Sequence, residues 1–309
     1  YVPGDAFYDH TVRQVESAPN IDLRLGTRAG VVEQTEQGTL RVQTSADPID
    51  AKWVFDTRPS RALVEASQTL QHFVGWHICF DEPVFDPTTV TLMDFDVSQE
   101  HGLHFMYVLP FSEYEAVVES TFFSPTVLPV STYEAYIRAY LLERSGASLS
   151  QLERAMVVRT ERGVVPMTPA TVAKPDAPGW HLLGTPGGFV RPATGYCFHA
   201  TGRWAQNQLD WLLAPTANVP SLRGGGLNWL DSVLLSYLDR APEKAPEIFL
   251  QLFERVQPDA LIRFLSDLGT AGDVLSVMRA MPAWPFIQEA MHLGLSSPVE
   301  VREPALGSM

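Results

Sequence analysis

A series of β-rich runs between residues 68 and 167 constrains the fold more than any other feature of the chain. In order, the runs are HFVGWHICF, TVTLMDFDV, LHFMYVLPF, EAVVESTFF and AMVVRTERGVVPM. Most follow one another after short polar breaks, which leave no room for the crossover helices that parallel strands need. We therefore expect an antiparallel sheet.

The segment STYEAYIRAYLLERSG, residues 131–146, predicts one helix within this series. Apolar residues recur at helical spacing, at positions 133, 136, 137, 140 and 141. Ser131 and Glu134 have the spacing of a capping box, and Gly146 is a suitable stop.

Shorter elements are expected on both sides of the sheet. Residues 5–17 can form an amphipathic helix with Asp5 as its N-cap, and IDLRLG, GVVEQ, TLRVQT and AKWVFDTRP predict short strands that end near Asp56. GTPGGFVRPATGYCFHATGRWAQNQLDWLLA predicts a glycine-rich turn and a helix from about Thr194 to Leu213. After RGGG, at 223–226, helices are expected until near Leu293, followed by a loose tail.

Composition and charge exclude several classes of protein. The 309 residues carry a formal net charge of −14 and no run of Lys or Arg, so a nucleic-acid-binding protein is excluded. Cys79 and Cys197 form neither a disulfide framework nor a CxxC pair, which favours a reducing, cytoplasmic compartment. No apolar stretch approaches the ~18 residues of a membrane span and no leader peptide is visible, so we expect any membrane contact to be peripheral.

Glu119 lies between apolar residues in EAVVESTFFSP, with no basic residue nearby in the sequence. On a strand it shares a face with Val117 and Thr121. Such a carboxyl group is solvent-facing, paired by a distant residue, or kept partly protonated, as a general acid needs. For a single strand Glu, a solvated face is the more common case. Asp94 in LMDFD poses the same question, and two acidic strands in one apolar region are more informative than either alone.

Other candidate motifs are weaker. The GTPGG turn offers backbone N–H groups to an anion or a cofactor, but it is also an ordinary connection before a helix. His101 and His104 invite a metal interpretation, yet no Cys or Glu lies at ligand spacing from them, so we predict no metal site. Ser120 lacks the G-x-S-x-G context of a hydrolase nucleophile.

Several segments taken together resemble the lycopene cyclases of the bacterial β-cyclase type. The matching segments are WVFDTRP, QHFVGWHI, FDPTTVTLMDFD, FMYVLPFS, AVVESTFFSP, YEAYIRAYL, ERGVVPMT, GTPGGFVRPATGYCFHATGRWA, RFLSD and MPAWPFI. They occur in family order from near the first residue to about residue 290. A single segment is a weak signal, whereas the ordered set is specific.

This resemblance implies an α/β, glutathione-reductase-like FAD-binding fold with an α+β substrate part. Residues 1–60 would be the remainder of the FAD-binding domain and 61–180 an antiparallel-sheet substrate domain. Residues 181–214 would form an FAD-binding loop and helix, 215–293 a helical region and 294–309 a tail. The family's N-terminal G-x-G-x-x-G turn is not in this sequence, so we expect an N-terminally truncated fold.

The resemblance also implies an activity, the acid-catalysed closure of the ψ-ends of lycopene into the β-ionone rings of γ-carotene and β-carotene. There is no net redox change, but the family requires reduced FAD, supplied through NAD(P)H. Glu119 corresponds to the first Glu of the family's L-E-E-T motif and takes the role of the essential acid, and Ser120 stands at the second Glu. Asp94 corresponds to the family's M-D pair and is the second catalytic candidate.

Further site residues are implied by the same match. Those expected to bind FAD are Asp56, Arg58, Gly187, Gly188, Pro192, Thr194, Gly195 and Tyr196. Those expected to line the flavin and substrate cavity are Met93, Glu161, Pro166 and Met167.

Two alternatives to the cyclase remain open, a flavin-dependent reductase or hydroxylase of the same fold acting on another isoprenoid, and a non-catalytic carotenoid-binding chain. Because lycopene dissolves in the bilayer, we expect peripheral membrane contact through aromatic residues of the C-terminal helices. Core packing is the alternative for these residues. They are Trp229, Phe249, Phe253, Trp284 and Phe286.

Overall fold

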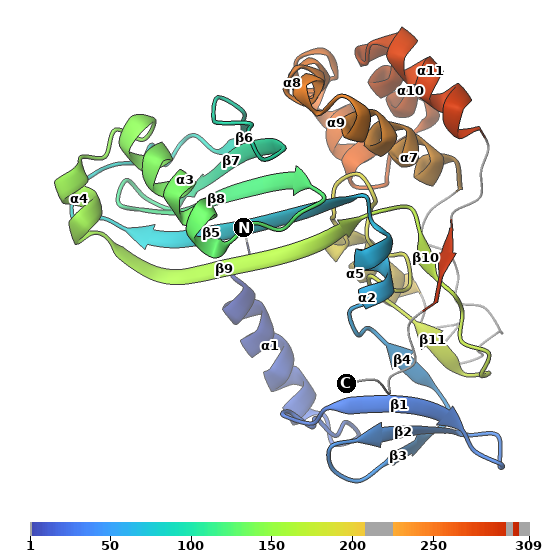
Figure 1. Ribbon diagram of the computed structural model, residues 1–309. Coiled ribbons are helices and arrows are strands. Elements are labelled where there is room, and N and C mark those ends of the chain that lie inside the picture. Colours follow the sequence, from blue (N-terminus) through green and yellow to red (C-terminus); the bar gives the residue numbers. More distant parts are fainter. Residues whose placement is uncertain (1, 208–224, 295–298, 303–309) are drawn as a thin grey trace. The chain divides into compact units, whose positions relative to one another are not determined.

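The computed structural model describes residues 2–207, 225–294 and 299–302 (Figure 1). These residues fall into two compact units, a small one made of 2–55 and 175–181 and a large one made of 56–174 and the described part of 182–304. The predicted limits at residues 60, 180 and 214 stay predictions, because a compact unit is not the same thing as a functional domain.

The small unit contains one helix and a short meander. Helix α1 (Gly4–Ser17) precedes strands β1 (Ala29–Gln34), β2 (Leu40–Thr44) and β3 (Ile49–Ala51), which pair antiparallel in that order. Asp5 lies in the first turn of α1 and not at its N-cap, which is Pro3. The predicted strand IDLRLG is wrong, because residues 21–26 are exposed coil and turn, without strand pairing in the described structure. β4 (Val54–Asp56) pairs with β11 (Trp180–Leu182).

The large unit is built on a five-stranded sheet. Its strands are β5 (Thr69–Cys79), β6 (Thr91–Asp94), β7 (Leu103–Pro110), β8 (Glu115–Ser124) and β9 (Met156–Met167). The spatial order is β6-β7-β8-β5-β9, and every neighbouring pair is antiparallel. The predicted antiparallel sheet is therefore confirmed.

The register divides the side chains of β5, β7, β8 and β9 by residue number. Because β5 residues pair with β8 and β9 residues of the same parity up to the bulge near Ile78, odd-numbered residues share one face and even-numbered residues share the other. We call these the odd face and the even face.

Helix α3 (Val130–Glu143) lies across β8 and β5 and covers the even face, together with the short α4 (Leu149–Arg154) (Figure 1). Trp76, Met106 and Val118 from the sheet pack there against Ile137 of α3. The cluster is almost free of solvent, since Met106, Val118 and Ile137 have no exposed surface.

The start of α3 differs from the prediction. Pro129 is the N-cap and has no capping side chain, so Ser131 falls inside the first turn and the predicted capping box is wrong. A capping box does form at α4, between Ser148 and Gln151. Gly146 has a φ of 75°, which confirms it as the residue that lets the chain leave α3.

The C-terminal helices pack on one end of the odd face. They are α7 (Gly225–Arg240), the 3₁₀ turn η1 (Pro242–Lys244), α8 (Ala245–Arg255), α9 (Pro258–Leu265), α10 (Ala271–Ala280) and α11 (Ala283–Leu293). Leu235 and Leu238 of α7 contact a cluster that includes Phe105, Phe123 and Met167 of the sheet. The helices predicted after RGGG, and their end near Leu293, are confirmed, whereas residues 215–224 of the predicted helical region lie outside the described residues.

Short elements complete the unit. α2 (Arg61–Ala66) is capped by Ser60, and β10 (Thr171–Val172) pairs in parallel with β12 (Glu300–Val301), so part of the predicted loose tail is a strand. α5 (Phe198–Asn207) begins later than the predicted Thr194, because Thr194 and Gly195 belong to a tight turn. The rest of that predicted helix, residues 208–213, and the start of RGGG lie outside the described residues.

In the part of the chain that the structure covers, no helix combines the length and the apolar character that crossing a bilayer requires.

Removing the buried side chain of Ile137 tests the packing of α3 on the even face. Ile137→Ala should lower the free energy of unfolding by about 2–5 kcal/mol, because it leaves a cavity between helix and sheet. Urea denaturation measures this change. Leu142→Ala, at a partly exposed position of the same helix, is the matched control and should have a much smaller effect. Equal losses in the two variants would contradict the described packing.

Candidate active site

Two carboxylates flank a glycine on the odd face. The register places Glu119 of β8 opposite Gly75 of β5 on one side and opposite Tyr107 of β7 on the other. Glu161 of β9 lies opposite Gly75 from the far side. A Cβ atom at Gly75 would be 3.2 Å from Cγ of Glu161 and 3.4 Å from Cβ and Cγ of Glu119. The two acidic side chains therefore share the space that Gly75 leaves open.

Glu119 is half-buried and has an unusual proton affinity. Burial raises the pKa of its carboxyl group to about 7, against a hydrogen bond from Thr121, and the charge of Glu161 raises the pKa further. Oγ1 of Thr121 donates that bond to Oε1 of Glu119 over 2.6 Å. Val117, its neighbour along the strand on the same face, is 2% exposed. A raised pKa corresponds to one of the three alternatives that the sequence left open for Glu119, a carboxyl group kept partly protonated.

Two tyrosines complete the surroundings of Glu119. Burial, Tyr196 and Glu119 together raise the pKa of Tyr107. Tyr196 is 66% exposed, but its hydroxyl end lies near enough to the sheet that burial and the charge of Glu119 raise its pKa as well. Tyr196, which follows Gly195, therefore lies close enough to Glu119 to interact with its charge.

The glycine-rich segment 184–196 is shaped by close approaches of its backbone to the sheet. At Gly195, with a φ of 72°, a Cβ atom would lie 2.9 Å from Oε1 of Gln71 and 3.2 Å from Cγ1 of Val165, both on the odd face. At Gly187 a Cβ atom would lie 2.5 Å from the carbonyl oxygen of Leu182. At Gly187 the clash is with backbone atoms, so a side chain would push the segment away from its support, and at Gly195 the positive φ itself is unfavourable for a residue with a side chain.

The other residues predicted to bind FAD lie along the same segment. Pro192 is buried, Thr194 is half-buried, and Gly188 has a φ of 75°. Asp56 accepts hydrogen bonds from the side chain of Arg58, at 2.6 and 2.9 Å, and its backbone carbonyl accepts one from Leu183 N–H at 2.9 Å. Asp56 and Arg58 therefore lie where this segment begins.

The backbone N–H groups of the segment are less available than the sequence suggested. Those of Gly188, Phe189, Thr194 and Gly195 donate to carbonyl groups within the segment itself, at 2.9 to 3.2 Å. They hold the turn in shape and do not point to a ligand. The idea that these N–H groups bind an anion is wrong for these four residues.

Arg191 is the residue of this region that the sequence analysis missed. Its side chain is 3% exposed, donates to the carbonyl oxygen of Phe264 at 2.6 Å and to Asp231 at 3.2 Å, and lies over the Phe264 ring at 4.4 Å. It thereby ties the glycine-rich segment to α7 and α9. Arg191 and Phe264 both occur in segments that resemble the family, but no sequence spacing shows that they meet.

The structure does not bring Asp94 to Glu119. Asp94 pairs with Met106, an even-face residue, and accepts a hydrogen bond from Oη of Tyr140 in α3 at 2.9 Å. Its neighbour Met93 packs instead against the cluster around Phe105 on the odd face. The two members of the predicted pair thus lie on different faces, and the catalytic role of Asp94 stays a prediction.

Ser120 also points away from Glu119. It is fully buried on the even face, where Nε2 of His104 lies 3.0 Å from its hydroxyl oxygen. In this strand, two consecutive acidic residues could not share one site, because neighbouring side chains point to opposite faces. The second carboxylate beside Glu119 comes from β9, as Glu161.

The remaining predicted cavity residues, Pro166 and Met167, also lie on different faces of the sheet. Met167 is 2% exposed in the apolar cluster of the odd face that Met93 also contacts. Pro166 is buried and pairs with Leu70 on the even side of β5.

Solved structures with a similar fold include the following two. One is a geranylgeranyl bacteriochlorophyll reductase-like protein from Thermoplasma acidophilum, 14% identical, with a TM-score of 0.51 over 94% of this chain and 75% of that one. The other is the flavin-dependent brominase Bmp2, 13% identical, with a TM-score of 0.52 over 94% of this chain and 76% of that one. The chain therefore has the α/β fold that these two proteins share.

Sequence comparison narrows the class to one family. The family model described as lycopene cyclase protein matches residues 16–291. A lycopene beta-cyclase from a Paracoccus species is 31% identical over 253 residues, which are 77% of this chain and 63% of the relative. The chain belongs to the lycopene cyclase family, and it spans somewhat less than two thirds of that relative's length.

The raised pKa of Glu119 predicts a pH-dependent cost to folding. Between its ordinary pKa of 4.5 and its native value of about 7 the folded state binds the proton and the unfolded chain does not, so Glu119 lowers stability as the pH rises through this window. Glu119→Gln removes that dependence. The free energy of unfolding of the variant, relative to that of the wild type, should therefore increase as the pH rises from about 5 to 8. Urea denaturation at several pH values measures this difference.

The exposed Glu113 at the turn before β8 supplies the control for this measurement. Glu113→Gln should differ from the wild type by the same amount at each pH. If the curves for Glu119→Gln and the wild type also run parallel, the carboxyl group of Glu119 does not titrate near neutral pH.

Proposed function

We propose that this protein is a lycopene β-cyclase, an isomerase that closes the acyclic ψ-ends of lycopene into β-ionone rings with no net redox change. The observation that carries the proposal is the half-buried carboxyl group of Glu119, whose pKa is about 7, on a sheet face that also holds apolar clusters. Membership of the lycopene cyclase family supports the choice of substrate.

In this proposal Glu119 is the general acid. It gives its proton to the terminal double bond of the polyene, the cation so formed is attacked by a second double bond, and a carbon–carbon bond closes the ring. Loss of a proton from the ring then restores a double bond, so the product is an isomer of the substrate. A pKa near neutrality suits this role, because the group holds its proton at working pH and yet releases it readily.

Glu161 is our candidate for the group that accepts the proton at the end. It shares the space above Gly75 with Glu119, and its carboxylate forms an ion pair with Arg159 at 3.3 Å. A carboxylate there also stabilises positive charge on the substrate end before the proton is lost. The proposal requires that the bound polyene and the apolar side chains of this face keep water from the cation, because water would convert it into an alcohol.

The residues present fit an FAD cofactor, which we propose this chain binds with the segment 184–196, Asp56 and Arg58. The segment's close approach to the odd face supports this, as does Oε1 of Gln71, a buried acceptor beside Gly195 without a partner in the described structure. Reduced FAD, regenerated by NAD(P)H, would supply negative charge near the developing cation. Tyr196 would connect this cofactor-binding segment to Glu119.

We further propose that a cytoplasmic, peripheral contact with the membrane gives access to lycopene. The aromatic residues expected there differ in their surroundings, since Phe249 stacks on Phe95 and Phe286 on Tyr237, whereas Trp284 is 68% exposed. Ile287 and Met291 are also exposed, and their spacing from Trp284 puts all three on one side of α11. This apolar stripe is the part of the described surface that we assign to the lipid interface.

Glu119→Gln should abolish ring formation in cells that accumulate lycopene. The full reading frame is expressed there, and pigments are separated by chromatography. The wild type should produce γ-carotene and β-carotene, and the variant should lose activity by about 10²- to 10⁴-fold, as expected when a general acid is removed. Glu113→Gln is the matched control and should keep activity. Full activity in Glu119→Gln, or NAD(P)H consumption that matches product formed, would overturn the proposal in favour of other chemistry.

Trp284→Ser should weaken the membrane contact without affecting the fold. Sedimentation with neutral phospholipid vesicles measures the bound fraction, and loss of one buried aromatic side chain should lower the partition coefficient about tenfold. Leu149→Ser, an exposed apolar position on α4, is the control and should bind as the wild type does. Unchanged binding of Trp284→Ser would place the lipid contact elsewhere.

A further inference from the structure

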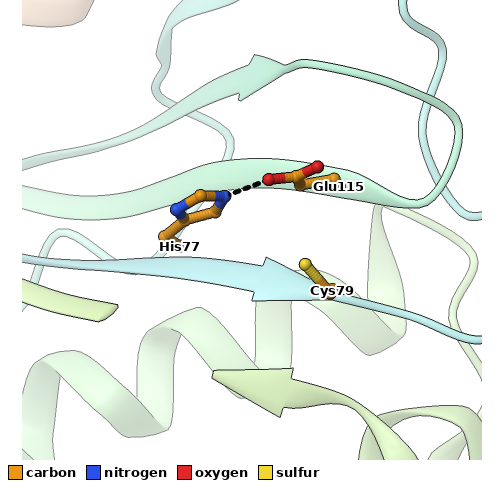
Figure 2. A group of neighbouring side chains, drawn as sticks. All are labelled: His77, Cys79 and Glu115. Atoms are coloured by element: carbon orange, nitrogen blue, oxygen red, sulfur yellow. Dashed lines mark hydrogen bonds and ion pairs between the residues drawn. The ribbon is translucent and has the colours of Figure 1, made fainter. Parts of the chain in front are cut away.

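Three side chains of different chemistry meet at the far end of the odd face, away from the C-terminal helices. They are His77 and Cys79 of β5 and Glu115 of β8 (Figure 2). The register sets Cys79 directly opposite Glu115, and His77 is two residues before Cys79 on the same side of β5. One nitrogen, one sulfur and one oxygen atom from these residues all lie within 4.8 Å of one another.

The backbone beneath this group is held in place. β5 pairs with β8 on one side and with β9 on the other along its whole length, so the Cα positions of the three residues are set by two ladders of hydrogen bonds. Phe111 packs edge-on against the His77 ring, with 5.5 Å between ring centroids. Nε2 of His77 is 2.5 Å from Oε1 of Glu115, so the imidazole already faces the carboxylate.

The group is also accessible to an ion from solution. His77 is 22% exposed and Glu115 is 38% exposed, and Cys79 is half-buried. Imidazole, thiolate and carboxylate are the three donor types that Zn²⁺ uses, at bond lengths of about 2.0–2.3 Å. Three protein ligands leave a fourth position for water. Arg159 of β9 pairs with His77 of β5. Its guanidinium forms an ion pair with Glu161, with 3.3 Å between Nη2 and Oε2.

We propose that His77, Cys79 and Glu115 form a binding site for a divalent transition-metal ion of the Zn²⁺ class. The ion takes the place of the proton between His77 and Glu115, and small rotations of the three side chains bring the donor atoms to bonding distance. The thiolate gives the site its preference for Zn²⁺ and Co²⁺ over Mg²⁺ or Ca²⁺, which favour oxygen ligands.

This site is separate from the proposed acid. Glu115 and Glu119 are four residues apart on β8, or about 13 Å along an extended strand. The inference therefore does not depend on the cyclase proposal. No sequence motif indicated it, because His77 and Glu115 are far apart in the chain and are brought together only by strand pairing.

Titration of the purified full chain with Co²⁺ tests the site, after removal of any purification tag. Coordination by a thiolate should give a charge-transfer band in the near ultraviolet, and d–d bands in the visible should have the intensity of a four-coordinate ion. Zn²⁺ should displace Co²⁺ and abolish the bands. Cys79→Ser should lose the charge-transfer band, whereas Cys197→Ser, which removes the other cysteine, should keep it.

His77→Ala and Glu115→Gln complete the test. Each should raise the dissociation constant for Co²⁺ about tenfold or more, because each removes one ligand. Circular dichroism shows whether the variants are folded. If a β5 variant is unstable, Cys197→Ser still decides the question, because Cys79 is then the one remaining cysteine that can give the charge-transfer band. Absence of the charge-transfer band in both the wild type and Cys197→Ser, or its persistence in Cys79→Ser, would overturn the proposal.

Discussion

The pairing of β5 with both β8 and β9 is the constraint on which the proposed chemistry of this protein depends. It places Glu119 and Glu161 on either side of Gly75, the one residue between them that has no side chain. Any larger residue there would have to displace one of the acids. Burial, together with the charge of Glu161 across Gly75, raises the pKa of the Glu119 carboxyl group to about 7.

The two faces of the sheet serve different purposes. Helix α3 covers the even face over β5 and β8, where a polar network is fully internal: His72 contacts Ser124 and Tyr133, and His104 contacts Ser120. Burial lowers the pKa of both histidines to about 4, so they are neutral at neutral pH. The described C-terminal helices cover one end of the odd face, and Glu119, Tyr107 and Glu161 beyond that end are half-buried. The even face thus packs against α3, whereas the residues of the proposed chemistry lie on the odd face of the same strands.

The buried arginine connects the parts of the site. Arg191 takes its partners from Asp231 in α7 and from Phe264 in α9, so the glycine-rich segment is positioned by the C-terminal helices as well as by the sheet. A buried guanidinium is costly without partners, and those partners come from segments 40 and 73 residues away in the chain. The C-terminal helices therefore support the proposed cofactor segment in addition to covering the sheet.

Much of this architecture could be predicted from local patterns. The antiparallel order, the helix over 130–143 and the C-terminal helices follow from hydrophobic periodicity and short connections, which are properties of neighbouring residues. The predictions of secondary structure were wrong where a neighbouring residue or a missing pairing partner outweighed the local pattern. Pro129 displaced the capping box of α3, the turn around Gly195 delayed the helix expected at Thr194, and IDLRLG has a strand-like pattern without strand pairing.

The sequence by itself determined the family and the main strands of the antiparallel sheet, and it singled out Glu119 as the candidate acid, because ordered motifs and alternation within one strand are readable along the chain. It could not decide that Glu161 is the companion of Glu119, that Asp94 and Ser120 face away from it, or that His77, Cys79 and Glu115 meet. Those facts depend on strand register, and a shift of one residue would move every side chain to the other face. Register is set by long-range pairing and by packing under α3, which only the tertiary structure contains.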